Sequence, residues 1–270
     1  METASKDVLF TIAMDLDLPD LLRWCSSNSR INKHVCQNDN VWRSKLLKDF
    51  PEGYPDYKIF NLNRSLKETY VFLYQLSYIK KMLNTKESIY DIFLRKELDL
   101  HSKELKKVPA FDLPNLEKLD LSKNELKKVP TFDLPNLRVL FLHSNLLTEL
   151  PQFDLPNLHT LYLYNNRLKK VPLFNLPNLQ TVSLSDNRLT RVPAFDLPSL
   201  QILSLHTNQL TEVPVFDLPN LHTLNLSNND LRKVPMFVLP NLRELLLHNN
   251  NFTEENKRKI EETYQHKVHF

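Results

Sequence analysis

Four histidines occupy equivalent positions in this sequence and raise the question of metal binding. His101, His143, His206 and His248 are separated by two or three units of a 21-residue repeat. If each 21-residue unit adds one parallel strand, neighbouring units lie about 4.8 Å apart. Successive histidines are then roughly 10–15 Å from one another, too far to share a zinc ion. We expect these histidines to be surface residues and predict no metal site.

Other catalytic chemistry has little support in the sequence. Carboxylates such as Asp112 and Asp133 recur with the same 21-residue spacing, which indicates architecture rather than an active site. No nucleophile, base and orienting group recur together, and the single glycine, Gly53, excludes a glycine-rich phosphate loop. We predict that the chain is not an enzyme and needs no cofactor. An enzyme or nucleic-acid binder on a repeat scaffold is the weaker alternative.

The charge balance gives no reason to expect nucleic acid or an anionic membrane as a partner. Lysine and arginine number 35 and acidic residues 32, a formal charge of +3. Lysine pairs recur beyond the predicted strands, but Thr148-Glu149 and Thr211-Glu212 interrupt them. We interpret this strip as a solvated face; its pairs are Lys106-Lys107, Lys127-Lys128 and Lys169-Lys170.

The two cysteines do not form a disulfide framework. On one continuous helix, the 11 residues between Cys25 and Cys36 would place them roughly 16 Å apart, beyond bridging distance. If they lie on different elements a bridge is possible, but we expect buried thiols in a reducing compartment. The sequence has neither a signal peptide nor roughly 18 consecutive apolar residues. We therefore expect an intracellular protein, cytoplasmic or nuclear, with no membrane partner.

A 21-residue repeat fills most of the chain. The pair Leu-Pro recurs with this period from Pro114 to Pro240. Around it stands the pattern L-x-x-L-x-L-x-x-N-x-L, as in Leu116 to Leu126. This pattern resembles the leucine-rich-repeat family over about residues 95–252, or eight repeats. The resemblance implies a solenoid that binds proteins.

Each repeat carries the signals of one short strand. Leu119 and Leu121 alternate with polar residues, which is strand periodicity. Asn124 follows at the strand end, where its side chain can satisfy backbone groups in a turn, and this asparagine recurs through the array. Phenylalanines recur from Phe111 to Phe237 and predict an apolar column on the convex side, while the prolines favour an extended or polyproline-like return segment.

The ends of such an array need caps, because one repeat cannot bury its own apolar face. Thr253 is typical of a helix N-cap, Ile260 and Tyr264 share one face of the helix that follows, and 268–270 read as a closing strand. Before the array, residues 64–83 form a predicted amphipathic helix with Phe72 and Leu76 on its apolar face. A shorter helix is predicted over 88–96.

The first 50 residues predict three helices. Residues 7–14 have helical apolar spacing, Pro19 and Asp20 suit a helix start, and a third segment spans 40–47. This order resembles the F-box, a helical motif that docks on the Skp-type adaptor of a cullin–RING ubiquitin ligase. The matching residues are Ile12, Leu16, the Asp17–Leu22 turn, Arg30 and Trp42, although Ala4-Ser5 replaces the usual leading Leu-Pro and the second helix is more polar than in the family.

The resemblance implies a Skp-type adaptor and a cullin as partners of residues 7–50. The adaptor-binding residues that it implies are Val8, Leu9, Ile12, Leu16, Pro19, Leu21, Leu22 and Trp42. Divergent F-boxes joined to repeats are typical of large DNA viruses, which points to host cytoplasm. The alternative is a helical cap that seals the solenoid, in a protein that binds or sequesters a partner without any link to ubiquitin.

The predicted fold is therefore α+β: an F-box-like helical domain (1–50), a helical linker and N-terminal cap (51–94), leucine-rich repeats (95–252) with a parallel sheet on the concave face, and a C-terminal helix cap (253–270). Repeats three and four place aromatic residues on the concave face, within a polar rim. We interpret this patch as the site of an unknown protein target, and scattered exposed aromatic residues without a partner are the alternative. Its residues are Val139, Phe141, His143, Thr160, Tyr162 and Tyr164.

Overall fold

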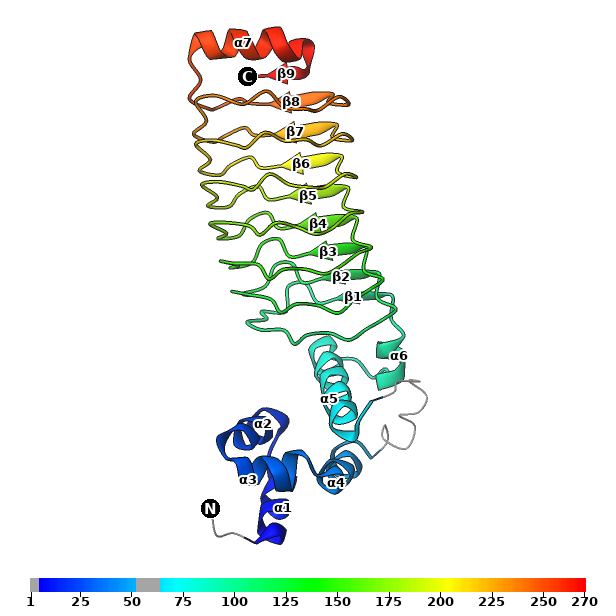
Figure 1. Ribbon diagram of the computed structural model, residues 1–270. Helices are drawn as coiled ribbons and strands as arrows, with labels where there is room; N and C mark the ends of the chain where they lie inside the picture. The colour runs from blue at the N-terminus through cyan, green and yellow to red at the C-terminus, as the bar shows by residue number, and fades with distance from the viewer. Residues whose placement is uncertain (1–4, 52–63) are drawn as a thin grey trace. The chain divides into compact units, whose positions relative to one another are not determined.

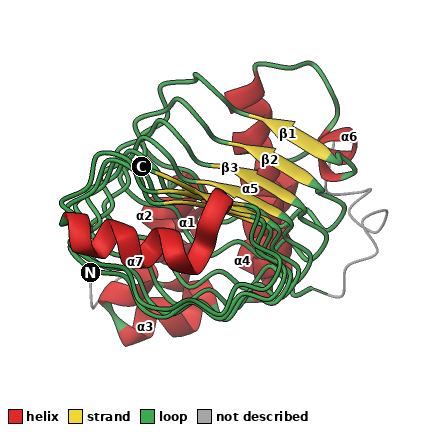
Figure 2. Ribbon diagram, turned by 90° about the horizontal axis from the view of Figure 1, so that it is seen from above, coloured by secondary structure: helices red, strands yellow, loops and turns green. Residues whose placement is uncertain are grey.

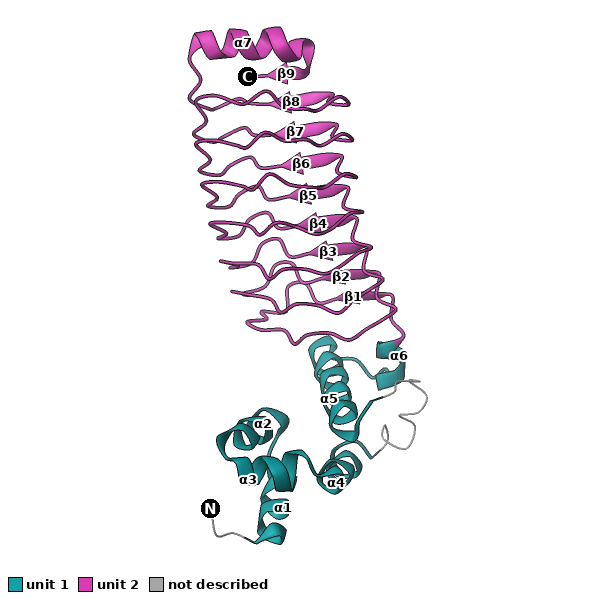
Figure 3. Ribbon diagram, in the orientation of Figure 1, with its two compact units in different colours: residues 1–93 teal, residues 94–270 magenta. Residues whose placement is uncertain are grey.

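The computed structural model describes residues 5–51 and 64–270. It divides into two compact units, residues 1–93 and 94–270 (Figure 3). Ala4, Gly53 and most of the predicted linker before residue 64 lie outside the described residues. Among the residues described, no helix is long and apolar enough to cross a membrane.

The regular elements of the first unit, within its described part, are all helices (Figure 1). Helices α1 (Lys6–Asp15), α2 (Leu18–Ser27), α4 (Asp39–Asp49), α5 (Leu66–Leu83) and α6 (Ile89–Phe93) occupy the predicted segments. The sequence did not predict α3 (Ser29–Ile31) or the π-helix η1 (Asn32–Cys36). Local capping explains two of the helix starts: Asp17 accepts a hydrogen bond from the Asp20 amide at 2.8 Å, and Ser65 forms a capping box with Glu68.

The core of this unit joins α4 to α5 through aromatic rings. Trp42 is buried and donates its indole N–H to the Cys36 carbonyl at 3.0 Å. Its ring lies 5.5 Å from that of Tyr70, whose hydroxyl donates to Asp49 at 2.6 Å. Burial, followed by the Asp49 carboxylate, raises the pKa of Tyr70. Lys45 is also buried, and it pairs with Asp49 at 3.0 Å, so its charge is compensated inside the unit.

The prediction of free cysteine thiols is wrong in this structure: Cys25 and Cys36 form a disulfide. The two residues are not on one continuous helix, because α2 ends at Ser27 and the chain turns at Asn28, whose side chain caps α3. Cys36 lies on η1, and the Cα–Cα distance is 6.0 Å, within the range of disulfides.

The second unit is a solenoid of eight repeats, each with one three-residue strand on the same side of its coil (Figures 1 and 2). The sheet is parallel in chain order, and neighbouring strands pair with a constant 21-residue offset, as in Leu119 opposite Leu140. The middle residue of each strand is buried and the flanking residues face outward, onto what we call the concave face. The predicted α+β class with a parallel-strand solenoid is confirmed. The strands are β1 (Glu97–Asp99), β2 (Lys118–Asp120), β3 (Val139–Phe141), β4 (Thr160–Tyr162), β5 (Thr181–Ser183), β6 (Ile202–Ser204), β7 (Thr223–Asn225) and β8 (Glu244–Leu246).

The recurring asparagine binds each repeat to the one before it. The Asn187 amide group donates to the carbonyls of Leu163, Leu184 and Ser185 at 3.0–3.1 Å, and its oxygen accepts from the Leu168 amide at 3.0 Å. Leu163 and Leu168 belong to the preceding repeat. These bonds satisfy backbone groups that the turn would otherwise leave buried and unpaired. The same arrangement recurs at Asn145, Asn166, Asn208, Asn229 and Asn250.

The residue before each of these asparagines has a left-handed backbone, as has Ser102 before Lys103 in the first repeat. Its φ lies between 51° and 55° in all eight repeats. No glycine stands at this position in the described array, so other residues adopt the left-handed conformation. Asn228 tolerates it well, whereas Thr207 is β-branched and tolerates it poorly.

A second column, of phenylalanines, fills the side of the coil away from the strands. All seven predicted rings are buried, and five of the six successive pairs stack, as Phe111 and Phe132 do with centroids 5.7 Å apart. The column continues into the C-terminal cap, where Tyr264 lies 6.2 Å from Phe237 and accepts a hydrogen bond from its backbone amide at 2.9 Å.

The predicted cap at the C-terminal end is confirmed. Helix α7 (Glu254–Tyr264) begins after Thr253, whose side chain accepts from the Asn256 amide, and Ile260 is buried. A short 3₁₀ turn, η3 (Gln265–Lys267), leads to β9 (Val268–His269), which pairs in parallel with β8. The last repeat therefore does not end in an open sheet edge.

Candidate functional site

Four rings on the concave face form one continuous cluster. Phe141 and Tyr162 stack with centroids 5.4 Å apart and planes 24° apart, and His143 stacks on Tyr164 at 4.3 Å and 7°. Edge contacts of 6.1 Å join Phe141 to His143 and Tyr162 to Tyr164. All four side chains are partly exposed. We call these four residues the aromatic cluster.

The repeat itself brings these residues together. Phe141 and Tyr162 are direct partners in the register of β3 and β4, as are Val139 and Thr160. His143 and Tyr164 follow two residues later, on the same side of each strand, because side chains alternate with period two. All six residues of the predicted target site are therefore neighbours on one surface, and each is partly exposed.

The cluster is apolar enough to shift the titration of its members. Burial lowers the pKa of His143, and Lys123 adds to this, whereas the nearby carboxylate of Asp120 opposes it. Burial also raises the pKa of Tyr164. Both effects favour neutral rings at pH 7, and stacked neutral rings are suited to contact with a partner.

An acidic group borders the cluster on the side of repeats one and two. Asp99, Asp120 and His101 hold their potential metal-ligand atoms within 4.8 Å of one another. The His101 ring and backbone amide lie 2.6 and 3.0 Å from Asp99 Oδ1, and Asp120 Oδ1 accepts from the Ser122 amide and hydroxyl. Burial alone would raise the pKa of Asp99, but the hydrogen bonds and charge of His101, together with the charge of Lys118, outweigh it and hold the pKa below its usual value.

This acidic group was not predicted from the sequence, because the spacing between the histidines bears only on histidine–histidine distances and not on the carboxylates beside His101. The signal was present in Asp99-Leu100-His101, where strand alternation places both polar side chains on the same face. Asp120 then lies directly opposite Asp99 in the register of β1 and β2.

The predicted adaptor-binding residues divide between the surface and the core of the first unit. Val8 on α1 is 48% exposed, Leu22 on α2 is 37% exposed, and Pro19 is exposed beside it. Ile12 and Leu16 are half-buried. These five residues remain available to a partner.

The other three, Leu9, Leu21 and Trp42, are almost fully buried in the helical core. In this structure they hold the helices together rather than form a surface. A substitution at any of them would test the stability of the unit before it tested an interaction.

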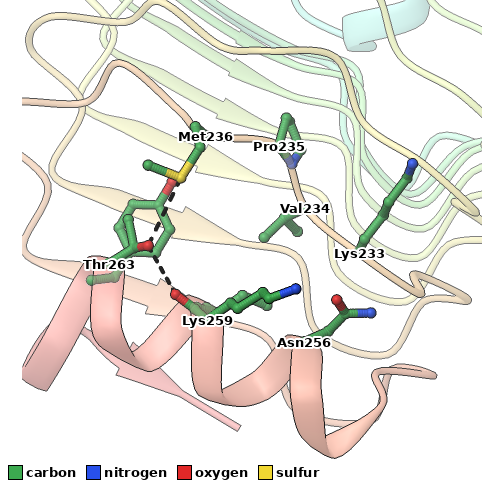
Figure 4. A pocket seen from close by; sticks show the side chains of 9 residues that line it. Lys233, Val234, Pro235, Met236, Asn256, Lys259 and Thr263 are labelled. Atoms are coloured by element: carbon green, nitrogen blue, oxygen red, sulfur yellow. Dashed lines mark hydrogen bonds between the residues drawn. The ribbon is translucent and has the colours of Figure 1, made fainter.

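Two hollows elsewhere do not resemble ligand sites. Figure 4 shows one between the loop 233–236 and α7, where Thr263 donates to the Lys259 carbonyl and contacts the sulfur of Met236. Its volume of about 210 Å³ is below the roughly 300–1,000 Å³ typical of small-molecule pockets. The other, an open hollow, is lined by Lys169, Arg188, Thr190 and Gln209 and has no aromatic or aliphatic side chain to hold a ligand.

Family profiles match the solenoid. The profile described as "Leucine Rich repeats (2 copies)" matches residues 135–176 and 177–218, and "Leucine Rich Repeat" matches residues 220–239. The predicted leucine-rich repeats are therefore confirmed. No curated protein sequence matches the chain.

Solved structures with the same fold are leucine-rich-repeat proteins. YopM, an effector of Yersinia pestis, is 28% identical, with a TM-score of 0.56 over 65% of this chain. InlP of Listeria monocytogenes is 24% identical, with a TM-score of 0.58 over 72% of this chain and 67% of its own. The complex of Latrophilin 3, Unc5D and the leucine-rich repeats of FLRT2 contains a chain that is 22% identical to this one, with a TM-score of 0.54. The match covers 60% of this chain and 54% of that chain. This chain spans 54% of the YopM chain.

These likenesses define the class of the second unit: a leucine-rich-repeat solenoid, a fold that serves as a protein-interaction module. The F-box resemblance concerns the first unit, which these profile matches do not cover.

Proposed function

We propose that this chain is a receptor that holds a target protein on its concave face and links it to a ubiquitin ligase of the Skp–cullin–F-box type. The observation that carries target binding is the aromatic cluster, because four partly exposed rings in mutual contact form a ready anchor within a polar rim. Chemistry takes place elsewhere in the complex, and the chain contributes proximity.

The link to the ligase is supported by the first unit. Its helices α1, α2 and α4 occupy the segments expected of an F-box, and Val8, Pro19 and Leu22 offer exposed apolar surface on two of them. A Skp-type adaptor would dock on this surface. The protein would then act in the cytoplasm or nucleus, where such ligases work.

A second function is favoured by the burial of Leu9, Leu21 and Trp42, which removes three of the eight expected contacts from the surface. In this alternative the chain binds or sequesters a protein through its concave face and has no role in ubiquitin transfer.

Binding of the full-length chain to a purified Skp-type adaptor, alone and with its cullin, separates the two functions. The variant Val8→Glu with Leu22→Glu should lose adaptor binding, because it puts charge on exposed apolar contacts. Leu47→Glu is the matched control: Leu47 is 53% exposed on α4 and is not among the expected contacts. No binding by the wild-type chain, or equal binding by all three, would exclude the ligase function and leave the sequestering function.

A further inference from the structure

One column of the concave face runs from carboxylates into aromatic rings. Asp99, Asp120, Phe141 and Tyr162 occupy the same position on four successive strands, each directly opposite the next in register. Neighbouring strands lie about 4.8 Å apart. The acidic group and the aromatic cluster are therefore parts of one surface rather than two separate sites.

The carboxylates bring excess negative charge to this surface. Asp99 and Asp120 have oxygens within 4.8 Å of each other, close enough for their charges to repel. Lys118 is close enough to act on the charge of Asp99, but it pairs with Glu97 at 3.4 Å and is therefore partly engaged already. His101 pairs with Asp99 and carries a charge only when protonated. A cation brought by a partner would relieve this repulsion.

The stacked rings supply the second half of a cation site. Because Phe141 stacks on Tyr162 with only 24° between their planes, one face of Phe141 is turned to Tyr162 and the other to β2, where Asp120 stands. A cation over that second face would meet the negative side of the ring and the carboxylate together. Asp120 can accept about four hydrogen bonds, and the two from Ser122 both go to Oδ1.

The shape of this position favours arginine over lysine. A guanidinium is planar, so it stacks on an aromatic face while its edge donates two parallel hydrogen bonds to a carboxylate. An ammonium is a compact, strongly hydrated charge that does neither as well. Beyond the rings, at the same position of the next strands, Ser183, Ser204 and Asn225 are uncharged, so the negative charge lies at one end of the cluster.

We propose that the concave face recognises an arginine side chain of its protein partner, with the guanidinium between Asp120 and Phe141 and Asp99 adding to the negative field. The proposal rests on the part of the proposed function that assigns target binding to this face, and it is independent of any ubiquitin role.

Selection of random 12-residue peptides displayed on phage against the full-length chain, in buffer with EDTA, tests the proposal. We expect arginine to be enriched among the binders. In synthetic copies of these peptides, replacement of the arginine by citrulline, which keeps the shape and removes the charge, should weaken binding at least tenfold. Asp120→Asn should weaken it by a similar factor, and Asp154→Asn, an exposed aspartate in the return segment, should leave it within twofold.

The outcomes distinguish this proposal from the function on which it rests. Binders that depend on Phe141 and Tyr162 but lack arginine, or that tolerate Asp120→Asn, would overturn arginine recognition and leave target binding intact. Binders that appear only without EDTA would assign Asp99, His101 and Asp120 to a metal ion and overturn the proposal. Binders insensitive to Phe141→Ala with Tyr162→Ala would overturn both the proposal and the assignment of this face to target binding.

Discussion

Replacement of Asn187 by alanine should destabilise the solenoid by about 2–4 kcal/mol. The side chain makes four hydrogen bonds to the backbone, and it is only 8% exposed. Of the groups it serves, the Ser185 carbonyl also accepts from the Asn165 amide and keeps that partner. The carbonyls of Leu163 and Leu184 likewise keep a bond, from the side chains of Asn166 and Asn208. Only the Leu168 amide would be left unpaired, at a cost of roughly 1–3 kcal/mol, and the three lost bonds to carbonyls that keep a partner add about 1 kcal/mol together.

Denaturant unfolding followed by circular dichroism measures this cost, and the same repeat contains a control. Asn178 is exposed and donates a single hydrogen bond, to the Pro156 carbonyl at 2.8 Å. Its replacement by alanine should cost about 1 kcal/mol or less. Equal stability of the two variants would refute this expectation, because the number and burial of the hydrogen bonds would then not decide the cost.

Three further results are expected. Thr207→Asn should raise the stability of the array by about 0.5–1.5 kcal/mol in denaturant unfolding, because asparagine tolerates the φ of 54° better than a β-branched residue; no gain would contradict the assigned backbone strain. Reduction of Cys25–Cys36 should destabilise the first unit by about 2–3 kcal/mol in thermal melts with and without reductant, since the bridge closes a short loop, and an unchanged melt would contradict the pairing. The pKa of His143, followed by NMR, should lie below its ordinary value of 6.5 and return toward it in Tyr164→Ala, so the stability that the neutral ring contributes is present above pH 6.5 and is lost as the pH falls.

The repeat could be predicted almost completely because its signal is periodic. The paired leucines locate every strand of the array, and period two then places Phe141 and Tyr162 on the outer face. The stacking of His143 on Tyr164 is a further consequence of the same register, but the sequence alone does not give the orientation of a ring.

The first unit was harder to predict because its contacts are not periodic. The disulfide depends on a chain reversal at Asn28 and on the π-helix that carries Cys36, and neither has a strong sequence signal. Likewise, apolar spacing marks Leu21 and Leu22 as helical residues, but only the packing against the other helices decides that Leu21 is buried and Leu22 exposed. A resemblance to a docking motif cannot make that distinction.

The asparagine bonds also make the array modular in a directional way. Each asparagine bonds its own turn and also completes the backbone of the repeat before it, so the backbone hydrogen bonding of a repeat is finished only by its successor. Since neighbouring strands always pair with the same offset, any repeat offers its successor the same set of unpaired groups. A gene encoding such an array can therefore gain or lose the codons of one whole repeat without disrupting the hydrogen bonds between neighbouring repeats. The concave face can then acquire new side chains while the contacts between repeats stay the same.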